Sequence, residues 1–153
     1  MAAFLDERFV CTYAKKGTLT VYQHADTGNV VKEGGNILSH VTSAEGALLH
    51  SIPANPGPEG YLAQLEFAAG LAELDRDQVQ AQHHELAILN RIPLGSDARV
   101  HRILDAHPLA PLPELEERLF VEILGQTYAP DAPLTLEVLN DAEWNATMNM
   151  AMG

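Results

Sequence analysis

The sequence predicts an α/β protein, and two observations carry that prediction. Two short apolar runs, residues 37–41 and 47–52, flank the turn signal Glu45-Gly46, an arrangement that is typical of a β-hairpin. Apolar residues then recur at helical spacing from Pro58 onward, and most of the second half of the chain continues this spacing. We therefore expect a small mixed sheet in the first half, covered and followed by helices.

Further strands are expected before the hairpin. β-Branched and aromatic residues favour strands at residues 9–13 and 19–22, and Val30-Val31 favours a short third one. Cys11 lies in the first of these patterns and is expected to be a small, buried side chain. The nearly continuous apolar character of the hairpin predicts burial on both faces, in the middle of a mixed sheet.

Capping residues predict the helix boundaries. Gly57 is the expected N-cap of the helix after the hairpin, with Pro58 in its first turn. A second helix is expected at about residues 75–89, and Ser96 is the expected N-cap of a third. A fourth helix follows Pro111-Leu112-Pro113 and is expected to end at Gly125.

The C-terminal residues predict an edge strand and a tail. Residues 134–138 alternate between apolar and polar and favour an edge strand. The segment 140–153 is polar apart from Trp144, Met148, Met150 and Met152. It is interpreted either as a frayed terminus or as an arm whose apolar side chains bind a neighbouring subunit.

The charge balance limits the classes of partner. The 153 residues carry 21 acidic and 9 basic side chains, a formal net charge of −12, with 46% hydrophobic residues. An acidic surface repels phosphates and anionic membranes, so we expect neither nucleic acid nor membrane as a partner. A single cysteine, and no basic N-terminal segment with an apolar core, predict a cytoplasmic protein without a signal peptide.

The first half resembles the C-terminal half of thioredoxin-like domains. The resemblance rests on five stretches: residues 4–10, Gly35-Asn36-Ile37-Leu38, Glu45-Gly46, Leu48-Leu49-His50 and Tyr61-Leu62-Ala63-Gln64-Leu65. It covers about residues 4–72 and implies an incomplete thioredoxin-like mixed sheet with helices. The predicted organisation is then a partial thioredoxin-like sheet and helix at 1–72, a helical extension at 73–139 and a C-terminal arm at 140–153.

The redox motif of that family is missing from this chain. There is no Cys-x-x-Cys pair, because the family's motif segment would lie before Met1, and Gly34-Gly35-Asn36 stands where the family has a cis proline. Thiol–disulfide exchange needs an attacking and a resolving cysteine, so the resemblance implies a redox-inactive core. An incomplete sheet would also expose an edge that another segment or chain must cover.

Histidines provide the candidate chemistry. The candidate metal ligands are His83, His84, His101 and His107. An antiparallel helix pair would gather three of them with Glu85 or Asp105. Imidazole and carboxylate groups suit zinc or iron. Adjacent histidines point about 100° apart on a helix, however, so a solvated role is the alternative. His40 and His50 are expected to face each other across the hairpin as a structural pair.

Two functions are therefore predicted. The favoured one is a non-enzymatic interaction or assembly subunit, without a cofactor, whose sheet edge and C-terminal arm contact a protein partner or further copies of the chain. The alternative is a metal-binding or redox enzyme that uses the histidines, or Cys11 as a peroxide-sensitive thiol. Stoichiometric zinc or iron is expected only for the alternative.

Overall fold

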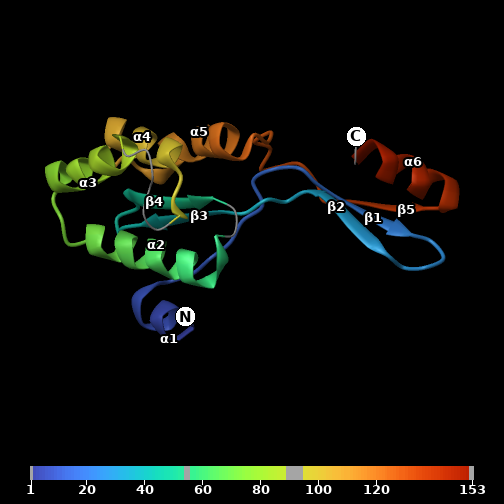
Figure 1. The fold of residues 1–153 in the computed structure, drawn as a ribbon, viewed down its shortest axis with the longest axis horizontal. Helices are drawn as coiled ribbons and strands as arrows, with labels where there is room; N and C mark the ends of the chain where they lie inside the picture. The colour runs from blue at the N-terminus through green and yellow to red at the C-terminus, as the bar shows by residue number, and fades with distance from the viewer. Residues whose placement is uncertain (1, 54–55, 89–94, 152–153) are drawn as a thin grey trace. The chain divides into compact units, whose positions relative to one another are not determined.

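The chain has a mixed α/β fold, which a computed structural model describes for residues 2–53, 56–88 and 95–151 (Figure 1). Its contacts divide it into two compact units. The larger unit combines Met1–Tyr13 with Asn36–Gln126, and the smaller one combines Ala14–Gly35 with Thr127–Gly153. Each unit is thus built from two separate stretches of the chain.

This division differs from the predicted ranges 1–72, 73–139 and 140–153. The predicted ranges follow the order of the sequence, whereas the chain leaves the larger unit after Tyr13 and returns to it at Asn36. The strands expected at 19–22 and 30–31 therefore belong to a different unit from the hairpin. They do not extend its sheet.

The larger unit is a hairpin between helices. Its described elements, in chain order, are α1 (Ala2–Arg8), β3 (Leu38–Thr42), β4 (Leu48–Pro53), α2 (Gly57–Leu71), α3 (Arg76–Ile88), α4 (Ala98–Ala106) and α5 (Leu112–Leu124). Strands β3 and β4 pair antiparallel, with a register shift between Val41 and Thr42. Helix α2 lies on one side of the hairpin, and α4 and α5 lie on the other (Figure 1).

Strand β4 forms the centre of this unit, because all its residues from 48 to 52 are buried. One apolar cluster joins the hairpin to α2 through Leu49, Leu65 and Ala68. A second cluster joins it to α4 and α5 through Leu48, Leu104 and Leu119. The predicted burial on both faces is confirmed for β4, whereas most of β3 is half-buried and its last residue, Thr42, is exposed. The expected position inside a mixed sheet is wrong: helices cover the two-stranded hairpin, and no other strand of the described residues pairs with it.

Helix boundaries follow the capping signals with shifts of one residue. Gly125 ends α5 in a left-handed conformation, as predicted. Pro56, and not Gly57, precedes α2. Asp97, and not Ser96, caps α4, because its carboxylate accepts a hydrogen bond from the Arg99 backbone N–H. The Ser96 hydroxyl instead lies 2.8 Å from His101 Nε2.

The smaller unit is a three-stranded sheet with one helix. Its elements are β1 (Leu19–His24), β2 (Val30–Gly34), β5 (Thr135–Leu139) and α6 (Asp141–Ala151). The strand order is β2-β1-β5, with β2 antiparallel and β5 parallel to β1. The predicted strands at 19–22, 30–31 and 134–138 are thus confirmed, the last as an edge strand. The tail is helical up to residue 151.

Two expectations about the N-terminal segment are wrong. Residues 9–16 form no strand, and Cys11 is exposed. The segment follows α1, and Phe9 packs together with Phe4 against the core of the larger unit. A β-prone composition alone does not produce a strand here, because no strand of the described residues pairs with this segment.

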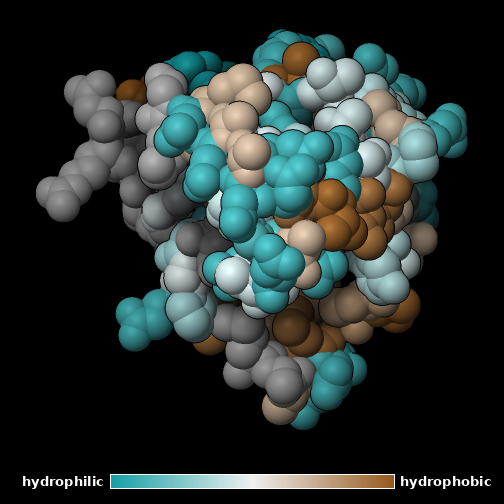
Figure 2. All heavy atoms as spheres, turned by 90° about the vertical axis from the view of Figure 1, so that its right-hand side faces the viewer, coloured by the Kyte–Doolittle hydropathy of each residue, from teal (hydrophilic) through white to brown (hydrophobic). Residues whose placement is uncertain are grey.

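Strand β5 exposes one row of apolar side chains. Leu134, Leu136 and Val138 alternate along the chain and are 58%, 61% and 60% exposed, whereas Leu139 is buried. Alternate residues of a strand share a face, so these three side chains form one uncovered row. Figure 2 shows exposed hydrophobic side chains among hydrophilic ones on the surface facing the viewer.

Among the described residues, no helix has the length and apolar character required to cross a lipid bilayer.

Candidate metal centre

Three buried histidines meet inside the larger unit. His50 comes from β4, His83 from α3 and His101 from α4, and each is 0% exposed. One ring nitrogen from each lies within 4.8 Å of the other two. The ring centroids are 5.2 Å apart for His50 and His101, 5.2 Å for His83 and His101, and 6.1 Å for His50 and His83.

The apolar pattern of each element explains why these histidines are buried. His83 lies between Val79 and Ala87 on α3, one turn from each, and both neighbours are buried. On α4, His101 shares the buried side of the helix with Val100 and Leu104. His50 belongs to the fully buried strand β4. Each histidine therefore occupies a position that the helix or strand period assigns to the core.

The Nε2 atoms of all three rings are held by groups outside the cluster. His83 Nε2 donates to the carbonyl oxygen of Leu49 at 2.9 Å, and His50 Nε2 donates to Gln64 Oε1 at 3.1 Å. His101 Nε2 lies 2.8 Å from Ser96 Oγ. A carbonyl oxygen only accepts hydrogen bonds, so His83 and His50 carry their proton on Nε2. The Nδ1 atom of each of these two rings therefore carries no proton and can accept a hydrogen bond or bind a metal ion.

None of the three Nδ1 atoms is used by the contacts outside the cluster. His83 Nδ1 and His101 Nδ1 are 2.9 Å apart, which requires a proton between them. That proton belongs to His101, whose Nε2 then accepts from the Ser96 hydroxyl. His50 Nδ1 is buried and makes no hydrogen bond. An unsatisfied buried acceptor costs about 1–3 kcal/mol, so this atom calls for an explanation.

The spacing of the rings is close to that of a three-histidine metal site. Zinc–nitrogen bonds of about 2.0–2.1 Å in tetrahedral geometry place two ligand nitrogens about 3.3 Å apart and their ring centroids about 5 Å apart. The nitrogen separation of 2.9 Å between His83 and His101 and the two centroid separations of 5.2 Å lie within a few tenths of these values. The centroids of His50 and His83, at 6.1 Å, are about 1 Å further apart. These two rings would have to move closer to each other to share one ion.

Burial keeps the three imidazoles neutral. Desolvation lowers the pKa of His50 to about 4, although the hydrogen bond to Gln64 opposes the shift. Desolvation and the neighbouring histidines lower the pKa of His101 to about 3. Desolvation also lowers the pKa of His83, against its bond to Leu49. Metal ligation requires neutral histidine, so these side chains are available as ligands at pH 7.

The predicted metal ligands are only partly brought together. His83 and His101 meet, but His84 lies on the surface, where its Nδ1 contacts Asp105 Oδ2 at 2.9 Å. His107 Nε2 instead lies 3.1 Å from Arg118 Nη1. Adjacent residues on a helix point in different directions, which separates His84 from the cluster.

The sequence pattern does not identify the third member of the cluster, because it pairs His50 with His40. The expected pair of His40 and His50 is wrong: the register places His40 opposite Ser51 and His50 opposite Val41. His40 Nδ1 lies 2.8 Å from Ser51 Oγ. The signal that could have identified His50 is its position in a fully apolar strand, where a histidine needs polar partners from other elements.

A second group, His24, Asp26 and Asp141 of the smaller unit, also offers nitrogen and oxygen atoms. Both His24 nitrogens are already engaged there. Nδ1 accepts hydrogen bonds from the backbone N–H groups of Asp26 and Thr27, and Nε2 contacts Asp141 Oδ1 at 2.8 Å. This arrangement ties the β1–β2 turn to the start of α6 and leaves no ring nitrogen for a metal.

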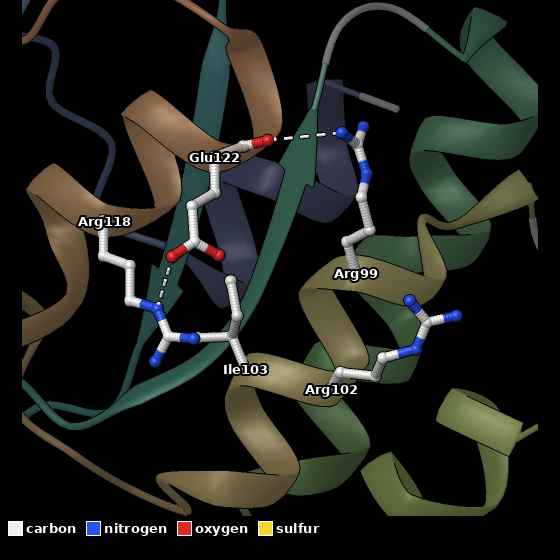
Figure 3. A pocket seen from close by; sticks show the side chains of 5 residues that line it. All are labelled: Arg99, Arg102, Ile103, Arg118 and Glu122. Atoms are coloured by element: carbon white, nitrogen blue, oxygen red, sulfur yellow. Dashed lines mark hydrogen bonds and ion pairs between the residues drawn. The ribbon is translucent and has the colours of Figure 1, made fainter.

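Figure 3 shows a pocket lined by three arginines on α4 and α5: Arg99, Arg102 and Arg118, with Ile103 and Glu122. Arg99 binds the Asp97 carboxylate and the carbonyl oxygens of Glu122 and Ile123. Arg118 pairs with Glu122 at 2.8 Å. Arg99 thus joins the end of α5 to the start of α4, where helix-end carbonyls attract positive charge. The pair of Arg118 and Glu122 lies within α5.

The predicted partner-binding residues of the tail differ in exposure. Trp144 is half-buried and packs edge-on against His24, with ring centroids 5.3 Å apart. Met148 is half-buried and Met150 is 77% exposed. Met152 lies outside the described residues. Trp144 therefore contributes to its own unit, and partner binding by the tail stays a prediction.

Comparisons with family models, curated proteins and solved structures give no match to this chain. The thioredoxin-like resemblance therefore stays a prediction. The histidine cluster has to be interpreted from its own geometry.

The buried neutral histidines predict a loss of stability in acid for the metal-free protein. The folded pKa values of about 4 and about 3 lie below the unfolded value, so the unfolded chain binds more protons. This stability is complete above about pH 6.5 and is lost as the pH falls toward the folded values. Urea unfolding with a chelator present should show roughly 2–4 kcal/mol less stability at pH 5 than at pH 7.

Matched leucine variants test this origin of the acid sensitivity. His101→Leu should lose less stability on acidification than the unaltered protein, because one buried titrating group is gone. The His84→Leu protein lacks only an exposed histidine and should lose as much stability on acidification as the unaltered protein. Equal acid sensitivity of the two variants would show that the buried cluster does not cause it.

Proposed function

We propose that this protein is a metal-binding protein whose ion is held by the Nδ1 atoms of His50, His83 and His101. The observation that carries the proposal is the arrangement of the three rings. Every Nε2 is engaged by a group outside the cluster, the Nδ1 atoms of His83 and His101 lie 2.9 Å apart, and one ring nitrogen of each histidine lies within 4.8 Å of the other two. A metal ion would supply the partner that His50 Nδ1 lacks.

The donor set favours zinc. Neutral imidazole is a ligand of zinc and of other late transition metals, whereas calcium and magnesium require oxygen ligands. No carboxylate belongs to this group of ligand atoms among the described residues. Zinc also tolerates the distorted geometries that a rigid core imposes, because its filled d shell has no geometric preference.

The outer contacts resemble those that orient metal ligands. A ligating histidine usually donates its other ring N–H to a carbonyl, carboxylate or hydroxyl group, which fixes the ring and its tautomer. Leu49 O and Gln64 Oε1 accept in this way. The Ser96 hydroxyl can either donate or accept, so the His101 proton can move from Nδ1 to Nε2 when an ion takes its place.

A purely structural histidine cluster is the competing interpretation. It accounts for the hydrogen bond between His83 and His101 but leaves His50 Nδ1 buried without a partner. Metal binding accounts for both the short distance between the nitrogens of His83 and His101 and the missing partner of His50 Nδ1. It would also cross-link β4, α3 and α4, so that part of the binding free energy would stabilise the fold.

Zinc titration of metal-stripped protein tests the proposal. One zinc ion per chain should bind and raise the thermal unfolding temperature, because binding to the native state alone stabilises it. His83→Gln should abolish stoichiometric binding, whereas His84→Gln, a change on the adjacent exposed residue, should leave it intact. Elemental analysis after gel filtration gives the stoichiometry.

Circular dichroism shows whether a loss of zinc binding in the His83→Gln protein comes from the missing ligand or from a loss of the fold. A His83→Gln protein with the same helical signal as the unaltered chain, but without zinc, supports the proposal. Zinc bound equally by both variants, or by neither the unaltered protein nor the variants, would contradict it.

Self-association is a second candidate function, favoured by the exposed row of Leu134, Leu136 and Val138 on the edge strand β5. Open strand edges with apolar side chains favour pairing with another chain. We propose that copies of this chain associate through β5, as the predicted assembly role requires.

Light scattering tests the second candidate. The unaltered protein should have at least twice the 16.6 kDa mass of one chain, and Leu136→Glu with Val138→Glu should reduce it to a single chain. The exposed Val121→Glu in α5 is a control that should leave the mass unchanged. A monomeric unaltered protein would exclude self-association.

A further inference from the structure

We infer that the three-histidine centre keeps one coordination position for a small anion from solution. This inference rests on the proposed metal binding and adds the class of ligand that the bound ion would take. It follows from the number of donors, the charge of the site and the packing around the three rings.

The donor count leaves a position open. Among the described residues, the group of ligand atoms at this place comprises the three histidines only. The nearest polar side chains, Gln64 and Ser96, contact Nε2 atoms on the outer side of the rings. Structural zinc sites have four protein ligands, whereas sites with three protein ligands complete the shell with an exogenous molecule.

The charge of the site selects an anion for that position. Three neutral imidazoles leave the full double charge of a divalent ion in a buried place, and an uncompensated buried charge is strongly unfavourable. The carboxylate that acts electrostatically on His83 is Asp105, which is held by His84 at the surface. Asp97, which acts on His101, is held by Arg99. An exogenous anion would supply the missing negative charge next to the ion.

The surroundings limit the size of the anion. All three histidines are 0% exposed. The ring of Phe67 lies edge-on to each of them, with centroids 5.3 Å from His50 and 5.9 Å from His83 and from His101. A ligand of two or three atoms would displace less of this packing than an aromatic carboxylate, which would have to displace Phe67. We therefore expect selection for small anions such as azide or cyanide.

Cobalt(II) substitution gives a direct readout of this position, because the visible spectrum of the ion responds to its ligands. Metal-stripped protein is loaded with one equivalent of cobalt(II), and azide is added in steps. The visible bands should shift progressively and reach saturation, while benzoate at the same concentrations should cause no shift. His84→Gln is the matched control and should behave as the unaltered protein does.

The outcomes separate this inference from the proposed function. Cobalt bound in a one-to-one ratio, with a spectrum that azide leaves unchanged, overturns the open position but not the metal site. An equal response to azide and benzoate overturns the size selection. Failure to bind either cobalt or zinc overturns the proposed function itself, and the inference with it.

Discussion

The larger unit depends on burying three imidazoles where β4, α3 and α4 meet. Each ring brings two nitrogen atoms into a region without water, and buried polar atoms need partners. The Leu49 carbonyl, Gln64 and Ser96 satisfy three of the six nitrogens, and the bond between His83 and His101 satisfies two more. The sixth, His50 Nδ1, has no hydrogen-bond partner, and the proposed ion would supply one, so this atom links the packing of the core to the proposed function.

Local patterns predict much of the fold but not its division into units. Turn and capping signals locate the hairpin, the strands at 19–22 and 30–31, and the end of α5 at Gly125, because these depend on residues close in sequence. The grouping of β1 and β2 with β5 depends on pairing across more than 100 residues, as between Val21 and Leu136. No local propensity encodes such a contact.

The candidate site shows the same limit. His83 and His101 can be predicted as neighbours, because both belong to helices that an antiparallel packing brings together. His50 is a strand residue that reaches the same place from another part of the chain. Ser96 was interpreted as a helix cap, since serine commonly has that role, but Asp97 caps the helix and Ser96 bonds to His101. In both cases a tertiary contact decides between two uses of one side chain.

X-ray absorption at the zinc edge of the loaded protein tests the central claim most directly, because it reports the atoms bound to the ion. The account predicts three nitrogen neighbours at about 2.0–2.1 Å, with the outer-shell scattering of imidazole rings. It also predicts one further neighbour, which belongs to a ligand from solution. A shell of oxygen atoms without imidazole scattering, or a sulfur neighbour from Cys11, would contradict it. The ion would then be bound at the acidic surface or at the exposed thiol, and the buried histidines would have a structural role alone.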